Sequence, residues 1–107
     1  MANKKILRFI KKLEDHDYTK CYVEEILGID IKVYIMCPLH PDTSKKCFVD
    51  IIEDCFECAT CGVRGGLVLL IMLVTKKSFK SIVLMLAKET QVEIPPIILG
   101  LKSSWYD

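Results

Sequence analysis

Apolar residues recur with a helical period near the start of the chain. Residues 3–13 have apolar side chains every three or four positions with charged ones between them, which is typical of an amphipathic helix. A second helix is predicted over residues 18–27, because Gly28 follows it and glycine readily takes the left-handed conformation that ends helices. Residues 14–17 predict an acidic break between the helices, with His16 as a surface residue without a role.

The middle of the chain changes to a strand pattern. Residues 31–36 are rich in β-branched and aromatic side chains, and residues 47–52 form a second such run. Glu53 and Asp54 predict a turn, after which residues 55–57 return as a third strand. The sequence therefore predicts a small antiparallel sheet.

Helical patterns return after the sheet. An apolar helix is predicted over residues 67–75, and Ser78 is a good N-cap for a further helix over residues 79–90. Pro95 and Pro96 are expected to end the regular structure. The predicted fold class is thus α+β, a short antiparallel sheet flanked by helices.

The length of 107 residues fits one compact domain. Within it we expect an N-terminal helical segment (residues 1–30), a metal-binding sheet with its C-terminal helices (residues 31–96) and an apolar tail (residues 97–107). Apolar residues make up 51% of the chain, and the longest run, residues 67–74, is too short for a bilayer span of about 20 residues. We interpret this run as a core helix; the alternative is that one side of it meets a partner chain.

Charge and cysteine content narrow the function classes. The net charge is +1, so any electrostatic contact with nucleic acid must come from a local patch. We interpret the basic residues of the first predicted helix as its solvent-exposed face; the alternative is that they contact nucleic acid or an acidic partner. The N-terminus has no apolar signal-peptide core, so we expect a cytoplasmic protein without membrane attachment, its cysteines reduced or bound to metal. The basic residues of that helix are Lys4, Lys5, Arg8, Lys11 and Lys12.

Two short pairs of potential metal ligands lie on either side of the predicted hairpin. Two residues separate Cys37 from His40 and Cys58 from Cys61, and 17 residues lie between the pairs. This spacing is typical of tetrahedral zinc, and three thiolates with one imidazole leave no position for substrate. Gly62 supports the assignment, since a glycine there can take a positive φ and close the turn around the sulfur. One structural zinc is therefore predicted; an iron–sulfur site and unliganded thiols are the alternatives.

The remaining cysteines are weaker candidates. Cys55 competes as a ligand because two residues separate it from Cys58. We expect Cys55 instead to be buried within the third strand. Cys47 and Cys21 are expected to act as small apolar residues in a strand and a helix.

The order of these motifs resembles the N-terminal zinc-binding domain of bacterial and phage DNA primases of the Cys-His-Cys-Cys type. The resemblance covers residues 24–96 and implies zinc at the four ligand positions above. Two positions depart from the family pattern: Lys46 replaces the proline of a Pro-Ser-Phe run, and Ala59-Thr60 replaces a Phe-Gly pair. The motifs that carry the resemblance are Cys37-Pro-Leu-His40, Cys47-Phe48, Cys55-Phe56, Cys58-Ala-Thr-Cys61-Gly62, Gly65-Gly66, Met72, Ser78-Phe79 and Leu86-Ala87.

In that family this domain helps to recognise single-stranded template DNA, while a separate domain joins ribonucleotides with carboxylate-held magnesium. We expect that polymerase domain to be absent here and the acidic pairs Glu24-Glu25 and Glu53-Asp54 to face solvent. For DNA contact, cations suit phosphates and aromatic faces suit bases. The alternative for the two phenylalanines is the core of the sheet. The candidate contacts are Lys45, Lys46, Phe48, Phe56 and Arg64.

We therefore expect a module that is non-catalytic alone and that binds single-stranded DNA or docks with a polymerase or helicase during primer synthesis. Its source would be a bacterial replication system, such as that of a phage or mobile element. Two alternatives remain: a protein-interaction adaptor that keeps the zinc scaffold without binding DNA, and an excised domain of a longer primase. We also expect self-association or contact with a replication partner, through the apolar residues 67–74 and 97–107. The alternative is that the tail, residues 97–107, folds back and covers the chain's own helices.

Overall fold

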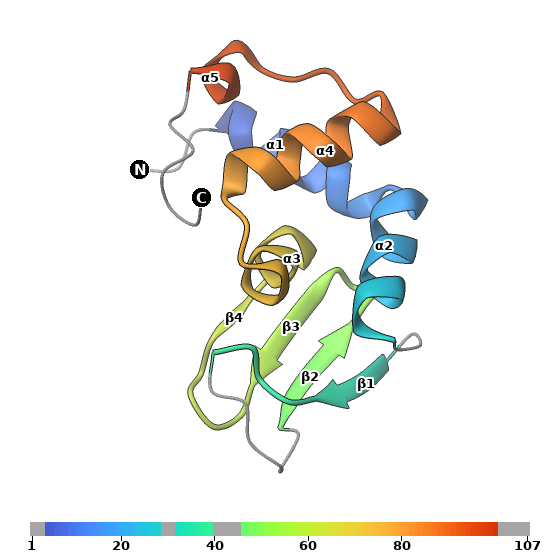
Figure 1. Ribbon diagram of the computed structural model, residues 1–107, viewed down its shortest axis with the longest axis vertical. Helices are drawn as coiled ribbons and strands as arrows, with labels where there is room; N and C mark the ends of the chain where they lie inside the picture. The colour runs from blue at the N-terminus through green and yellow to red at the C-terminus, as the bar shows by residue number, and fades with distance from the viewer. Residues whose placement is uncertain (1–3, 29–31, 40–45, 101–107) are drawn as a thin grey trace.

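The computed structural model describes residues 4–28, 32–39 and 46–100. Figure 1 shows the strands at one end of the molecule, α1 and α4 at the other, and α3 between them. The α+β class predicted from the sequence is confirmed. In chain order the elements are α1 (Lys4–Asp15), α2 (Asp17–Leu27), β1 (Lys32–Ile35), β2 (Cys47–Asp50), β3 (Cys55–Cys58), β4 (Arg64–Gly65), α3 (Leu67–Thr75), α4 (Phe79–Thr90) and α5 (Pro96–Leu99).

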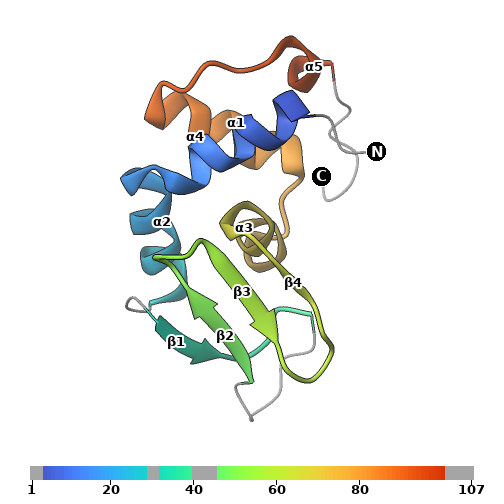
Figure 2. The same cartoon turned by 180° about the vertical axis from the view of Figure 1, so that it is seen from behind.

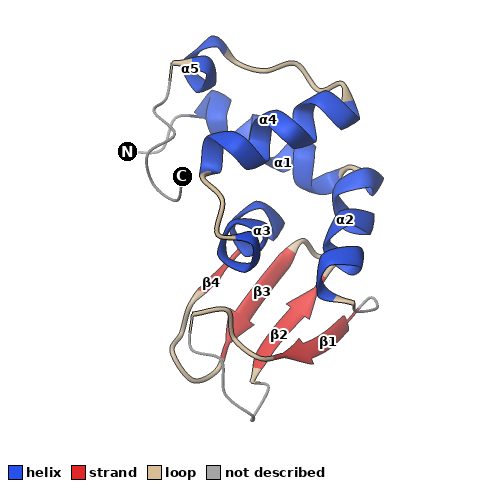
Figure 3. Cartoon of the chain, viewed as in Figure 1, coloured by secondary structure: helices blue, strands red, loops and turns tan. Residues whose placement is uncertain are grey.

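The four strands form one antiparallel sheet in the order β1-β2-β3-β4 (Figure 3). Tyr34 lies opposite Phe48, Phe48 opposite Glu57, and Glu57 opposite Arg64. Residues paired in this way project to the same side of a sheet, so the four side chains form one row across one face. The two-residue strand β4 was not predicted, because Arg64-Gly65 is too short to show a strand period.

Helix α3 is the centre of the core. It packs against one face of the sheet, and α1 and α4 lie beyond it (Figures 1 and 2). Most of its side chains are buried, including Leu67, Leu70 and Ile71, which have no exposed surface. A helix that is apolar on every side must be covered on every side. The core-helix interpretation is confirmed, and contact of residues 67–74 with a partner stays a prediction, for which the half-buried Leu69 and Val74 are the accessible side chains.

The N-terminal helices share that core, through Phe9, Leu13 and Val23. Helix α1 continues into the predicted acidic break as far as Asp15, and α2 begins at Asp17, so the interruption is confined to His16. The Nδ1 atom of His16 accepts a hydrogen bond from the backbone N–H of Tyr18 at 3.2 Å, so His16 is the N-cap of α2. The prediction that His16 has no role was wrong.

The helix boundaries that depend on local chemistry agree with the sequence. Gly28 ends α2 in the left-handed conformation, with φ of 64°. The hydroxyl of Ser78 accepts a hydrogen bond from the backbone N–H of Ser81 at 3.1 Å and caps α4.

The C-terminal prolines start a helix rather than ending regular structure. Pro96 is the first residue of α5, where a missing N–H costs nothing because that position has no intrahelical acceptor. Ile98 is fully buried in the core, whereas Ile97 and Leu99 are exposed. The rest of the predicted tail, residues 101–107, lies outside the described residues. No helix in the described ranges is long and apolar enough to cross a bilayer.

Candidate metal centre and nucleic-acid interface

Three of the four predicted zinc ligands converge at one end of the sheet. The sulfur atoms of Cys37, Cys58 and Cys61 all lie within 4.8 Å of one another, and the Sγ atoms of Cys37 and Cys61 are 3.8 Å apart. Zinc–sulfur bonds of about 2.3 Å in a tetrahedron place two ligand sulfurs about 3.8 Å apart. The thiol cluster therefore fits zinc in both donor chemistry and size. His40, the predicted fourth ligand, lies outside the described residues.

The turn after β3 is built around the sulfur of Cys58. The backbone N–H of Gly62 donates to the carbonyl of Cys58 at 2.9 Å, and the N–H of Cys58 donates to the carbonyl of Val63 at 2.8 Å. Gly62 has φ of 77°. A Cβ atom there would meet nothing within 4 Å, so the backbone conformation, and not lack of space, favours glycine. The predicted positive φ is confirmed.

Cys47 lies beside the metal cluster without belonging to it. It pairs with Cys58 across β2 and β3 and has no exposed surface. Burial, together with the neighbouring sulfur groups, raises the pKa of the Cys47 thiol to about 12. Its complete burial in β2 agrees with its predicted role as a small apolar residue in a strand.

Cys55 is within a strand as predicted, but it is exposed rather than buried. Side chains alternate along β3: Phe56 and Cys58 are buried, whereas Cys55 and Glu57 are exposed on the opposite face. Cys55 therefore points away from the thiol cluster. Cys21 is in a helix as predicted, and its side chain is also exposed.

The face of the sheet turned away from α3 carries aromatic and charged side chains. The rings of Tyr34 and Phe48 are 5.2 Å apart and inclined by 52°, and Tyr34 is 63% exposed. A depression of about 560 Å³ on this face is lined in part by Phe48, Glu57 and Arg64. Tyr34 was not singled out from the sequence. The sequence could have indicated it, because successive side chains in a strand point to opposite faces, so Tyr34 and its neighbour Ile35 lie on different faces of the sheet.

The predicted DNA contacts divide into surface and core residues. Lys46 and Arg64 are exposed and Phe48 is half-buried, so these three are accessible. The carbonyl of Lys46 accepts a hydrogen bond from the N–H of Ala59 at 3.1 Å, which places Lys46 beside the second ligand pair. Phe56 is only 1% exposed, and a base cannot stack on a ring that is covered. Its inclusion among the contacts is corrected, and Lys45 lies outside the described residues.

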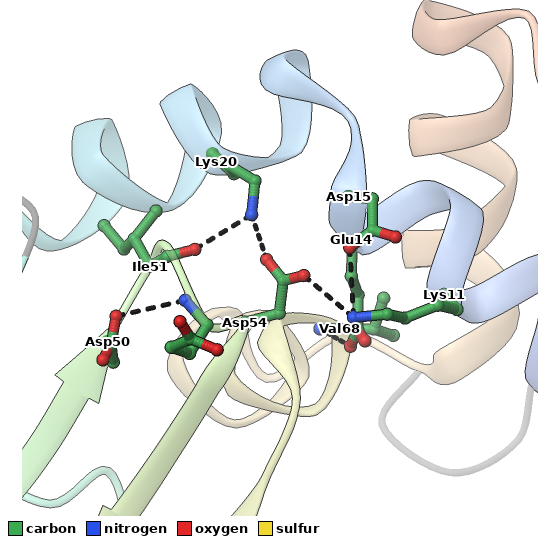
Figure 4. A network of polar contacts seen from close by, with 9 residues as sticks. Lys11, Glu14, Asp15, Lys20, Asp50, Ile51, Asp54 and Val68 are labelled. Atoms are coloured by element: carbon green, nitrogen blue, oxygen red, sulfur yellow. Dashed lines mark hydrogen bonds and ion pairs between the residues drawn. The ribbon is translucent and has the colours of Figure 1, made fainter.

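An ion network fixes the β2–β3 turn to the N-terminal helices (Figure 4). The carboxylate of Asp54 pairs with Lys20 and, at 3.2 Å, with Lys11. Lys20 also donates to the carbonyl of Ile51 at 3.0 Å. Asp54 is only 7% exposed and has φ of 58°. The expectation that the Glu53-Asp54 pair faces solvent holds for Glu53 and was wrong for Asp54, because α1 and α2 cover the turn.

Comparison with known proteins identifies this arrangement. A family model described as the CHC2 zinc finger matches residues 31–98. The chain belongs to the CHC2 zinc finger family of DnaG-type primases. Within this family a DNA primase from Synechococcus elongatus is 36% identical to the chain over 59 residues, which are 55% of the chain and 8% of that primase. The solved Aquifex aeolicus primase, comprising zinc-binding and RNA polymerase domains, matches with a TM-score of 0.63 and 24% identity over 81% of the chain.

The CHC2 match and the thiol cluster together indicate one structural zinc per chain. The chain covers 8% of the cyanobacterial primase and 22% of the Aquifex structure. It corresponds to the zinc-binding domain of a primase rather than to the catalytic part. Helices α1 and α2 precede the region that the family model matches.

Proposed function

We propose that this chain is a template-binding module for primer synthesis, non-catalytic alone, that binds single-stranded DNA across the open face of its sheet. In this proposal Cys37, His40, Cys58 and Cys61 hold the zinc. Cys37 follows β1 and Cys58 ends β3, so the metal would link strands across the sheet and fix its face. The observation that supports the proposal is the exposed row of aromatic and cationic side chains on that face.

The row suits a single strand of nucleic acid because its chemistry is divided along its length. Tyr34 and Phe48 offer ring surface on which bases of any sequence can stack, and Arg64 at the other end of the row offers charge to the phosphates. Lys46, which is exposed just before β2, adds a second charge. Glu57 stands between Phe48 and Arg64 and repels phosphate. We expect the bases, rather than the backbone, to pass over that position. So few cations give weak, salt-sensitive binding.

The chemistry of primer synthesis is assigned to a partner. Nucleotidyl transfer needs metal ions held by clustered carboxylates, and the thiol cluster is the only group of potential metal ligands found among the described residues. We propose that a polymerase domain or subunit supplies the catalytic metals, and that docking to it or to a helicase brings the bound template into place.

One observation favours a second candidate, a protein-interaction adaptor that does not bind DNA. Met36 and Leu39, on either side of Cys37, are 48% and 53% exposed. With Tyr34 they put apolar surface next to the metal centre, which suits a protein partner as well as a base.

The test is binding of zinc-loaded protein to a fluorescent oligothymidine over a range of salt concentrations. Arg64→Ala and Lys46→Ala should each weaken binding and lower the slope of log affinity against log salt. Tyr34→Ala should weaken the free energy of DNA binding by about 1–3 kcal/mol, because a stacked base loses its ring. Glu57→Gln should strengthen DNA binding, because it removes a charge that repels phosphate. Lys88→Ala, an exposed substitution on α4, is the matched control. No binding at low salt by folded, zinc-loaded protein would favour the adaptor.

A further inference from the structure

A groove of about 330 Å³ lies between α1 and the segment that leads into α5. Its rim carries Lys5, Arg8 and Lys12 from α1, and Glu93 lies on the other side. Phe9, 3% exposed, and the two prolines Pro95 and Pro96 give it an apolar floor. Figures 1 and 2 both show α5 and the start of α1 at the end of the molecule far from the sheet.

The basic residues of α1 differ in what they already contact. Lys11 is engaged by Asp15 at 3.1 Å and by Asp54 at 3.2 Å, so it belongs to the ion network behind the sheet. Arg8 and Lys12 are exposed and lie four residues apart, on one side of the helix. Together with Lys5 they place three cations along one wall of the groove.

We propose that this groove binds an acidic peptide segment of a partner protein, with carboxylates on the α1 rim and an apolar side chain on the Phe9–proline floor. Arg8 suits a carboxylate because the guanidinium can donate two parallel hydrogen bonds to it. Glu93 can accept backbone N–H groups of a peptide, which nucleic acid lacks. The proposal does not depend on DNA binding by the sheet.

A nucleic-acid strand fits the same groove less well. The ring of Phe9 is too covered to stack with a base, and no other residue that lines the groove is aromatic. The groove is lined by α1 and the segment that leads into α5, which Figure 2 shows at the opposite end of the molecule from β1 and β2, the strands that carry Tyr34 and Phe48, so it does not continue that face. Its α1 wall precedes the matched family region, its other wall belongs to the end of that region, and it contains none of the metal ligands.

The experiment uses the zinc-loaded full chain, labelled with ¹⁵N, and a synthetic peptide of alternating glutamates and leucines. A twin peptide with glutamine in place of glutamate is the control ligand. We expect amide shifts confined to α1 and Glu93, binding that weakens with salt, and little binding of the twin. Arg8→Glu with Lys12→Glu should weaken binding by about tenfold, and Arg8→Gln with Lys12→Gln by less. Lys46→Glu, just before β2 and far from the groove, should leave peptide binding unchanged.

Four results would overturn the proposal. They are no shifts with the acidic peptide, equal binding of the glutamine twin, shifts located on the sheet, and wild-type binding by the folded charge-reversal variant. Oligothymidine that shifts α1 residues, and loses that effect in the Arg8 and Lys12 variant, would assign the groove to nucleic acid instead. Loss of DNA binding on the sheet with peptide binding intact would count against the proposed function alone.

Discussion

The carboxylate of Glu14, near the end of α1, accepts a hydrogen bond from the backbone N–H of Val68 at 2.9 Å (Figure 4). Helix α3 has glycine at its N-cap, Gly66, and no side-chain cap of its own. Glu14 therefore supplies both an acceptor and a negative charge to the first turn of α3. A Cβ atom at Gly66 would collide with that carboxylate. The first helix and the central helix are thus fitted to each other at one point.

Removing this cap should destabilise the protein. Glu14→Ala leaves the N–H of Val68 without its acceptor, and we expect a loss of about 0.5–2 kcal/mol in the free energy of unfolding. Gly66→Ala should also destabilise, because the carboxylate must move away. Urea unfolding of zinc-saturated protein measures both effects, with the exposed substitution Glu25→Ala as the control. Equal stability of Glu14→Ala and Glu25→Ala would contradict the capping role.

The same carboxyl should give stability a specific pH dependence. Burial raises the pKa of Glu14, and the hydrogen bond from Val68 only partly opposes this. The folded state thus holds the proton to higher pH than the unfolded state, whose pKa is near 4.5. The part of the stability that comes from this proton is complete below that value and is lost as pH rises through the folded pKa, whereas a carboxyl oxygen can accept the hydrogen bond from Val68 in either protonation state.

Glu14→Gln cannot titrate and provides the comparison. The unfolding free energy of the wild type minus that of Glu14→Gln should fall as pH rises above about 4.5. Taking the difference removes the pH dependence of zinc binding, which the two proteins share. A difference that stays flat, or that grows with pH, would show that the raised pKa is not present in solution.

Among the acidic residues of the β2–β3 hairpin, substitution of Asp54 should cause the largest loss in the free energy of unfolding. Asp54→Asn preserves the side-chain shape and tolerates the left-handed backbone at this position, so it isolates the charge. Lys20, with its side chain 22% exposed, would lose its carboxylate partner. We expect a loss of roughly 1–3 kcal/mol. Glu53→Gln, at the exposed neighbouring position, should change stability by less than about 0.5 kcal/mol; comparable losses in both would refute the network.

Local chemistry explains which parts of the fold were predictable. Gly28, Ser78 and Gly62 act through their own backbone or the next few residues, so the sequence shows their roles directly. The spacing of Cys58 and Cys61 works in the same way, because a single turn at Gly62 brings these two residues together. These features do not depend on how distant elements pack.

The missed features depend on contacts between distant parts of the chain. Glu14 and Val68 are 54 positions apart, and Lys20 and Asp54 are 34 positions apart. An acidic residue next to a turn has the same local pattern whether it is solvated or covered by two helices. The reassignment of Phe56 from surface to core is similar, since the strand alternation gives two faces but does not say which one a helix covers.

Metal removal should separate the cysteines into two classes. Purified protein should hold one zinc, and chelation should unfold the sheet, because a zinc site of this kind forms only in the folded state and its binding energy is folding energy. Cys58→Ser should lose zinc, since Cys58 belongs to the thiol cluster. Cys55→Ser should keep it, because Cys55 is exposed on the other face. Elemental analysis measures the zinc content of each variant, and circular dichroism measures the loss of structure on chelation.

Cys47→Ser is the sharper control, because Cys47 is buried next to the cluster and pairs with Cys58. Serine keeps a small donor in the same place, so zinc content should remain at one per chain while stability falls by about 1–3 kcal/mol from burying a hydroxyl. His40→Ala tests the fourth ligand in the same assay. Full zinc occupancy in Cys58→Ser, or loss of zinc in Cys47→Ser with His40 intact, would show that the metal uses a different set of sulfurs.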